Sequence, residues 1–443
     1  MKSVLFLFVL ILTFSVSPCL RGGFNYSHAA EIRTLTLDQA LSIAMDKNRD
    51  IEKAREYARY VQGKYVEERS AALPQLYLNG SVMLSQDDSQ KALLGISPRQ
   101  YSRVVDLTLS QPLYTWGKVN AAIRAAKVGL KTADEQLRLY QQSTYRDVST
   151  AFYDILLARE LNTLASENLA QKQRLLEESR RKYAAGVATD YDVLAAEVAV
   201  ENARPEVIRS ANAIRAARER LRFLLALDNQ ELNVSGTLVT TVDPAKSYEQ
   251  ALLIARDKRP ELSDLHHRIG IYQELVTIAN AEDKPRLDLK GGAGWHWLEA
   301  KDNDLSENGN GAAWNIGVYL SFPFFDGLKT NGKVTQARSD LRTKEIEAAK
   351  LLDNIALEIR NASDAVKEAA DIVSALGGTV IQAERLVQMA EKGFEFGVKI
   401  RLEVDDAQLN LLQARSNLAR AQRDYLVARV NYEWAMGVAG ESP

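Results

Sequence analysis

Two near-copies of one nonapeptide, QALSIAMDK at residues 39–47 and QALLIARDK at residues 250–258, lie 211 positions apart in this chain. The same offset carries three residues that mark turns onto identical ones: Pro74 onto Pro285, Pro112 onto Pro323, and Gly186 onto Gly397. A constant offset of this kind indicates one structural unit written twice. We place the first copy at residues 30–227, a linker at 228–246, the second copy at 247–437 and a tail at 438–443.

Each copy has the same order of expected elements: an amphipathic helix, two strands joined by a polar loop, and a long helical hairpin. The first helices are predicted at residues 37–70 and 248–281. The strands are predicted at residues 76–85, 103–111, 286–297 and 314–322. The connecting loops, 86–100 and 298–312, are rich in Asp, Asn, Ser and Gly, which is typical of exposed tips. The hairpins are predicted at residues 117–227 and 328–437.

The first helix of each hairpin is predicted to be very long. Residues 117–181 and 328–392 contain no proline and are rich in strong helix formers. About 65 residues at 1.5 Å each make a rod of roughly 100 Å, which no ordinary globular domain needs. A returning partner helix indicates an antiparallel coiled-coil hairpin. We expect the pair Gly377-Gly378 to interrupt the second rod with a local bend.

All four predicted strands set an apolar face against a polar one. The last strand, for example, alternates Trp314, Ile316, Val318, Leu320 and Phe322 with Asn315, Tyr319 and Ser321. A half-buried sheet of a soluble protein alternates in the same way. Four such strands in matching repeat positions, with Trp and Tyr near their ends, favour a membrane barrel around water. Four strands cannot close a barrel, because about eight are needed, so we expect subunits to share it.

The first 29 residues read as a secretory signal peptide. Lys2 precedes a mostly apolar run at residues 4–16, and a small-x-small cleavage pattern stands at residues 27–29. The alternative is lipid attachment at Cys19, which Pro18 makes unusual. Cys19 is the only cysteine, so its removal would leave no thiol chemistry in the mature chain.

Composition and motifs argue against nucleic-acid binding and against an enzyme. The net charge is −2 and charges of both signs are interspersed, which gives no basic footprint. There is no nucleophile elbow and no phosphate loop. His266 and His267 are adjacent, so on a helix they point about 100° apart and cannot chelate one ion together. We therefore expect no catalytic residues, no cofactor and no metal.

Four short segments carry a resemblance to a known family. They are the strand-to-helix turns QPLY (residues 111–114) and FPFFDG (322–327), and the hairpin tips YAAGVAT (183–189) and FEFGVKI (394–400). With the signal peptide, the duplicated unit and the long rods, the chain resembles the TolC-like outer-membrane efflux family over nearly its whole mature length.

The resemblance implies a homotrimer in the outer membrane of a Gram-negative-type envelope, with a large periplasmic portion. Twelve strands would form one β-barrel in the lipid, continuous with a periplasmic α-helical barrel. The chain would then be the exit duct of a tripartite efflux or type I secretion system. The hairpin tips would contact a periplasmic adaptor protein, coupled to an inner-membrane transporter, through Ala185, Gly186, Val187, Thr189, Phe396, Gly397 and Val398. The family's usual Val-Gly-Leu tip core is replaced here in both hairpins.

The resemblance also implies a periplasmic gate. The family places two acidic residues six and nine positions after the second tip glycine, which are Glu403 and Asp406 here. It ties the two hairpins together through positions that correspond to Asp192 and Lys399. A third position, tyrosine in the best-known members, is Phe394, which has no hydroxyl for that hydrogen bond. The alternative is that the acidic residues only favour the start of a helix through its macrodipole.

Two other classes of protein share part of this pattern. A periplasmic adaptor also carries a helical hairpin, but it needs one hairpin between β-rich halves rather than two hairpins with paired strands. A soluble coiled-coil scaffold explains the rods but not the four amphipathic strands. Fractionation distinguishes the channel, the adaptor and the scaffold, because a channel is expected in the outer membrane as a heat-modifiable oligomer.

Overall fold

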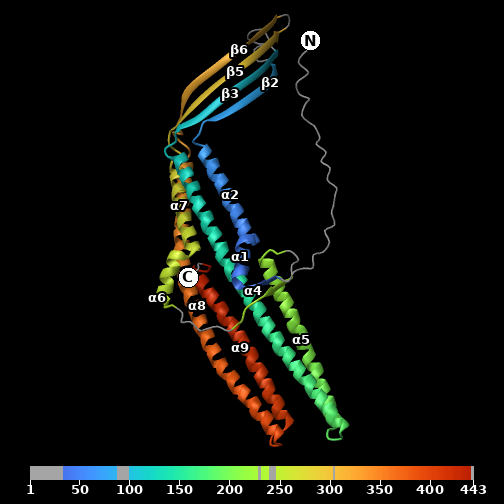
Figure 1. Ribbon diagram of the computed structural model, residues 1–443. Helices are drawn as coiled ribbons and strands as arrows, with labels where there is room; N and C mark the ends of the chain where they lie inside the picture. The colour runs from blue at the N-terminus through green and yellow to red at the C-terminus, as the bar shows by residue number, and fades with distance from the viewer. Residues whose placement is uncertain (1–32, 87–98, 228–230, 239–245, 303–304, 441–443) are drawn as a thin grey trace, which may run out of the picture.

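The computed structural model describes residues 33–86, 99–227, 231–238, 246–302 and 305–440. The described chain is elongated, with a β-sheet at one end and two helical hairpins at the other (Figure 1). The signal-peptide prediction and Cys19 fall outside the described residues. In chain order the elements are β1 (Arg33–Leu35), α1 (Leu37–Lys47), α2 (Arg49–Ser70), β2 (Gln75–Gln86), β3 (Arg99–Tyr114), α4 (Lys118–Ala184), α5 (Asp190–Leu224), β4 (Leu232–Val234), α6 (Tyr248–Lys258), α7 (Pro260–Asn280), β5 (Arg286–Asp302), β6 (Leu305–Ser321), α8 (Lys329–Glu395) and α9 (Arg401–Ala435).

The two hairpins have matching dimensions. Helices α4 and α8 each contain 67 residues, and α5 and α9 each contain 35. The longer helices therefore extend for roughly 100 Å. Helix α8 runs through Gly377 and Gly378 without a break, so an interruption of the helix there is wrong, while a local bend stays a prediction. Two glycines weaken a helix by only about 1 kcal/mol each, and α8 packs along α9. Within the described residues, no helix combines the length and the apolar character needed to cross a membrane.

The four long strands form one antiparallel sheet in the order β2-β3-β5-β6. The predicted strands are present, and all of them are longer than predicted. The predicted loop at 298–312 is largely wrong, because β5 continues to Asp302 and β6 starts at Leu305. Cross-strand pairing, such as Leu298 with Gly309, extends this hairpin through residues with low intrinsic strand preference. Of the other predicted loop, residues 87–98 lie outside the described residues.

The predicted alternation holds along most of the sheet, but far from the helices the charged residues Arg99, Arg103, Glu299 and Lys301 stand at positions of the apolar face. One rung of the ladder joins Leu78, Leu107, Ala293 and Trp314, and the next joins Asn79, Asp106, Gly294 and Ala313. Residues paired across a ladder share a face, so the sheet has one apolar and one mostly polar face. The apolar face is uncovered in the single chain: Trp314 is 77% exposed and Leu78 is 75% exposed. The sheet also projects beyond the helices (Figure 1).

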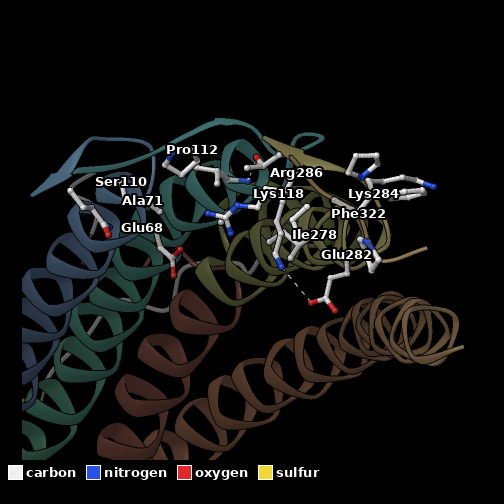
Figure 2. A pocket seen from close by; sticks show the side chains of 18 residues that line it. Glu68, Ala71, Ser110, Pro112, Lys118, Ile278, Glu282, Lys284, Arg286 and Phe322 are labelled. Carbon is white, nitrogen blue, oxygen red and sulfur yellow. Dashed lines mark hydrogen bonds and ion pairs between the residues drawn. The ribbon is translucent and has the colours of Figure 1, made fainter. Parts of the chain in front are cut away.

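A cavity of about 710 Å³ lies where the sheet meets the helices. Figure 2 shows the side chains that converge on it from α2, α4, α7 and the strand ends. The Glu282 carboxylate accepts from Lys333 at 2.5 Å and lies 3.6 Å from Lys118. The hydrogen bond from Lys333, helped by the charge of Lys118, holds the pKa of Glu282 below its usual range. Glu282 thus links the starts of α4 and α8 beneath the sheet.

Each helix predicted as continuous before the strands is in fact two helices. The first breaks at Asn48, whose backbone is extended (φ −60°, ψ 130°). Its Oδ1 accepts from the backbone nitrogen atoms of Asp50 at 2.9 Å and Ile51 at 3.3 Å, which caps α2. The second breaks at Arg259, because Pro260 favours an extended conformation in the preceding residue and suits the first helical position.

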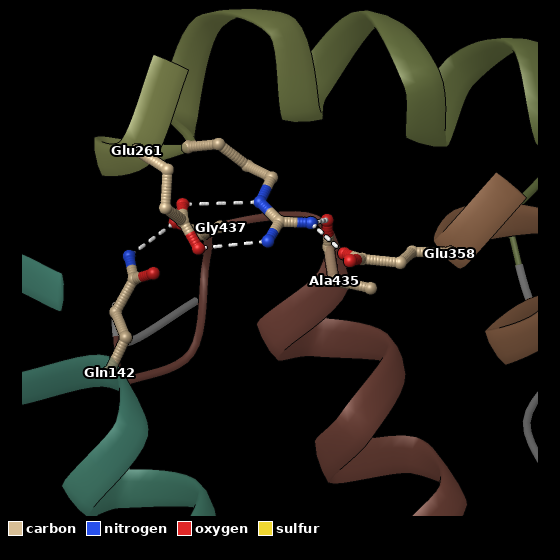
Figure 3. Close-up of polar contacts among 6 residues, drawn as sticks. Gln142, Glu261, Glu358, Ala435 and Gly437 are labelled. Carbon is tan, nitrogen blue, oxygen red and sulfur yellow. Dashed lines mark hydrogen bonds and ion pairs between the residues drawn. The ribbon is translucent and has the colours of Figure 1, made fainter. Parts of the chain in front are cut away.

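A buried arginine fastens the second break to the hairpin (Figure 3). The Arg259 side chain is 3% exposed and pairs with Glu261 at 2.8 Å and with Glu358. Its Nη1 also lies 3.5 Å from the carbonyl oxygen of Ala435, at the end of α9. Nearby, Gln142 of α4 donates to the carbonyl oxygen of Gly437 at 2.6 Å. These contacts join the second hairpin to α7 and to the first hairpin.

Two apolar cores lie where the shorter helices meet the hairpins. The first contains Ala40, Ala44, Val148, Ile155 and Leu221, and the second contains their counterparts at the same offset: Ala251, Ala255, Ile359, Val366 and Tyr432. Part of the predicted linker belongs to the first core. Strand β4 pairs in parallel with β1, and this pairing buries Leu35 and Val234.

Candidate functional site

The two hairpin tips share one backbone design. Gly186 and Gly397 adopt left-handed conformations with φ of 78° and 73°. In each tip the nitrogen of the following valine donates to a carbonyl five residues back: Val187 to Lys182 at 2.9 Å, and Val398 to Gly393 at 2.8 Å. This hydrogen bond is typical of a helix that ends on glycine. The seven predicted docking residues, Ala185, Gly186, Val187, Thr189, Phe396, Gly397 and Val398, are all exposed.

The predicted ion pair between Asp192 and Lys399 is not formed in the described chain. Asp192 Oδ2 instead accepts from the backbone nitrogen and from the hydroxyl of Thr189, both at 2.8 Å. These two hydrogen bonds lower the pKa of Asp192. Lys399 pairs with Glu403 of its own hairpin. Each residue thus finds a partner three or four positions away, which satisfies it without crossing to the other hairpin.

The start of α9 keeps its acidic residues at the surface. Glu403 Oε2 accepts from the backbone nitrogen of Ile400 at 3.0 Å, so it caps the helix as well as pairing with Lys399. The hydrogen bond from Lys399, followed by that from Ile400, lowers the pKa of Glu403. Asp406 is exposed and forms no ion pair within the described residues. At a spacing of three, both carboxylates lie on one side of α9.

Different residues connect the two hairpins near their tips. A cavity of about 350 Å³ lies between them, and Asp192, Phe394 and Asp405 are among its lining residues. Lys172 of α4 lies 3.3 Å from Asp405 of α9. Lys182 Nζ of the first hairpin lies 5.8 Å from the ring centroid of Phe394 in the second. The Arg401 guanidinium carbon, which belongs to the same hairpin as Phe394, lies 5.6 Å from that centroid.

We call Lys172, Lys182, Phe394, Arg401 and Asp405 the tip latch. The ring of Phe394 has no hydroxyl to donate, but its π-face attracts cations at these distances. Sequence reasoning singled out Phe394 and missed Lys172, which stands in the middle of a long helix without a local motif. Nothing in the sequence near Lys172 indicates that Asp405, 233 positions away, is its partner.

Comparison with known proteins defines the class. The model of the outer membrane efflux protein family matches residues 40–227 and 252–438, so the chain belongs to that family. The predicted family is therefore confirmed, and the chain is an outer-membrane protein with a large periplasmic portion. Both matched segments follow the duplication: their first residues, Ala40 and Leu252, fall within the repeated nonapeptides.

Individual relatives agree with this assignment. The chain is 24% identical to outer membrane protein TolC of Vibrio cholerae over 384 residues, which are 84% of each chain. It is 26% identical to alkaline protease secretion protein AprF of Pseudomonas aeruginosa, over 77% of this chain and 71% of that one. The fold matches the CmeC outer membrane channel of Campylobacter jejuni with a TM-score of 0.80 at 18% identity, covering 96% and 95% of the two chains. The predicted fold class is thereby confirmed.

Proposed function

We propose that three copies of this chain assemble into a passive outer-membrane duct that receives substrates from a periplasmic adaptor and an inner-membrane transporter. The observation that carries this proposal is the open four-stranded sheet, which exposes an apolar face and leaves β2 and β6 as edges. Backbone groups within lipid must be paired inside the protein, so such a sheet has to close. Three copies supply twelve strands, more than the roughly eight that a barrel needs.

The tips are the proposed docking surface for the adaptor. Val187, Phe396 and Val398 are large apolar side chains held on tight turns, and Val398 is 80% exposed. Exposed apolar groups at a fixed position are typical of a surface that a partner covers. The first tip has the small residues Ala185 and Gly186, whereas the second has the large Phe396. The two tips therefore present surfaces of different shape to the adaptor.

The proposed gate combines a ring of charge with the tip latch. In a trimer, three copies of Glu403 and Asp406 would gather carboxylates at the narrow end, which attracts cations and repels anions. The tip latch takes over the role that the family resemblance assigned to Asp192 and Lys399. A cation–π contact contributes about 0.5–1 kcal/mol at an exposed site, and an exposed ion pair about 0–1 kcal/mol. Such a latch holds the hairpins together and still allows an adaptor to open them.

Closure of the barrel by three chains can be tested by mass. The purified protein in detergent should have the mass of three chains by light scattering with detergent correction, and it should form channels in planar bilayers. A monomer or a dimer would contradict the twelve-stranded arrangement. A trimer that never conducts in bilayers, even when the latch is weakened, would contradict the duct.

A further inference from the structure

A histidine and an aspartate pair on the polar face of the sheet. His296 Nε2 of β5 lies 2.9 Å from Asp106 Oδ1 of β3. His296 is directly opposite Val104, and Asp106 is directly opposite Gly294, so both side chains lie on the mostly polar face. Neither is buried: Asp106 is 31% exposed and His296 is 47% exposed at the side chain. Water and ions therefore reach the pair.

The backbone around the pair is built to fit it. A Cβ atom on Gly294 would lie 1.9 Å from Asp106 Oδ1 and 2.3 Å from the carbonyl oxygen of Val105. Any side chain there would push the carboxylate away, so the glycine leaves the space that the carboxylate occupies. On β6, the residue opposite His296 is Gly311, which adds no side chain of its own. The carboxylate is thus held beside the imidazole by the shape of the sheet.

Other charges on this face stand apart from the pair. Strand β2 has no charged residue, and β6 has none from Asn308 to Ser321. Asp302 and Glu307 occupy register positions of this face, six residues from His296 and four from its partner Gly311, or about 20 and 13 Å along the strands. Arg99 and Arg103 of β3, and Glu299 and Lys301 of β5, lie at register positions of the opposite face of the sheet. On the same face, Arg286 pairs with Asp288, and Lys290 lies over the ring of Tyr319. Lys290 is opposite Ser110, four residues from Asp106, or about 13 Å along the strand. That separation exceeds the Debye length of about 8 Å in physiological salt.

We propose that the Asp106–His296 pair is a cation-attracting site on the inner wall of the barrel, which protonation of His296 switches off. The inference rests on the proposed function, since it requires the polar face to line a conducting lumen. Neutral His296 donates a hydrogen bond from Nε2–H to the Asp106 carboxylate, and the pair carries one negative charge. Protonated His296 leaves the pair neutral. In a trimer, protonation of all three copies would change the charge of the wall by three.

The test is the ion selectivity of single channels in planar bilayers under a KCl gradient. Measurements at about pH 7.5 and 5.5 bracket histidine titration while staying above the range in which ordinary carboxylates titrate. The cation-to-anion permeability ratio of the unmodified channel should fall by about two-fold or more on acidification. The variant His296→Gln, which keeps a donor for Asp106, should lose most of that fall. The matched control His266→Gln, on α7, should retain it.

A second variant separates the effect of the Asp106 charge from the effect of His296 protonation. Asp106→Asn should bring the ratio at neutral pH close to that of the acidified unmodified channel, with little further change on acidification. An equal fall in the unmodified channel and in His296→Gln would overturn the inference and leave the duct intact. No fall in the unmodified channel would overturn it in the same way. The absence of any conductance would instead contradict the proposed function.

Discussion

The two copies of the repeated unit solve the same structural problem with different chemistry. Asn48 and Arg259 stand at equivalent helix breaks, 211 positions apart, and both are buried. Asn48 Nδ2 donates to the carbonyl oxygen of Leu224 at 2.8 Å, and Arg259 reaches that of Ala435, its equivalent, at 3.5 Å. Each side chain thus fastens a break to the end of the returning helix. The arginine alone brings a charge, and therefore needs carboxylate partners.

The tips differ in the same manner. Tyr183 and Phe394 are equivalent, as are Asp192 and Glu403, and the turns between them have matching backbone hydrogen bonds. Among the contacts of the described residues, only the second tip has its aromatic ring between cations. Duplication therefore preserved the backbone signals of the hairpin, while the side chains around them acquired separate roles. The comparison predicts that equivalent substitutions in the two copies have unequal effects.

The largest difference is expected at the helix breaks. Arg259→Ala leaves Glu261 without its buried cation, and breaking a buried pair costs roughly 3–5 kcal/mol. Glu358 is 44% exposed and recovers water, so we expect about 3 kcal/mol. Asn48→Ala removes a helix cap and should cost about 1–2 kcal/mol. Thermal unfolding of the purified protein, followed by circular dichroism, gives the ranking.

Conservative variants show whether charge or geometry causes that difference. Asn48→Asp keeps a cap acceptor but loses the donor to the carbonyl oxygen of Leu224 and buries a carboxylate beside that oxygen, so it should be no more stable than Asn48→Ala. Arg259→Lys keeps the charge but loses the forked geometry, so it should recover only part of the loss. Equal destabilisation by Asn48→Ala and Arg259→Ala would show that the charged network adds nothing beyond the shared contact.

The next difference concerns the tip latch. Phe394→Ala removes the ring between Lys182 and Arg401, a loss of about 0.5–1 kcal/mol for each contact, because both cations are partly exposed. We expect a higher open probability in planar bilayers, by about five-fold if 1 kcal/mol is lost. The equivalent Tyr183→Ala should leave the gate unchanged, because no cation lies over that ring among the described contacts. Equal opening by both variants would place the latch elsewhere.

A smaller effect is expected from the acidic ring of the second tip. Glu403→Gln with Asp406→Asn should reduce cation selectivity and weaken block by multivalent cations, because six charges leave the narrow end of a trimer. The equivalent residues of the first copy are Asp192 and Ala195. The control variant Asp192→Asn therefore removes one charge from each chain and leaves every residue of the second tip unchanged. Unchanged selectivity in the double variant would mean that these carboxylates only start the helix.

The sequence was most informative where a local signal decides the structure. The tip glycines and the alternating strands act within a few neighbours, and the offset of 211 residues shows that these local signals occur twice. Together they predicted the order of the elements. The ends of β5 and β6 were missed because the polar stretch after Trp297 resembles a loop. Its pairing depends on a partner strand rather than on its own composition.

Contacts between distant segments were beyond sequence reasoning. Strand β1 pairs with β4 from the far end of the first copy, and no local pattern marks three-residue strands. Near the tips, the predicted pair of Asp192 with Lys399 is not formed in the described chain, and the position of the gate stays a prediction. Asp192 and Lys399 have local partners, and the Lys172–Asp405 contact appears only when the hairpins lie side by side.

The smallest effect on stability is expected after the end of α5, where a residue other than glycine adopts a left-handed backbone conformation. Ala226 and Gly437 are equivalent, and both follow a hairpin with a left-handed backbone, at φ of 48° and 75°. A left-handed residue with a Cβ costs roughly 1–2 kcal/mol, and glycine's freedom in the unfolded chain offsets about 0.4–1 kcal/mol of any gain. Ala226→Gly should therefore stabilise the protein by only about 0.5 kcal/mol.

The reverse substitution in the second copy provides the control. A Cβ on Gly437 would lie 2.8 Å from the backbone nitrogen of Arg259 and 2.8 Å from the carbonyl carbon of Lys258. Backbone atoms cannot move aside as a flexible side chain can, so Gly437→Ala should destabilise by about 2 kcal/mol. Melting temperatures should therefore move in opposite directions for the two variants. A lower melting temperature for Ala226→Gly would mean that the methyl group of Ala226, which is half-buried, contributes more through packing than its backbone strain costs.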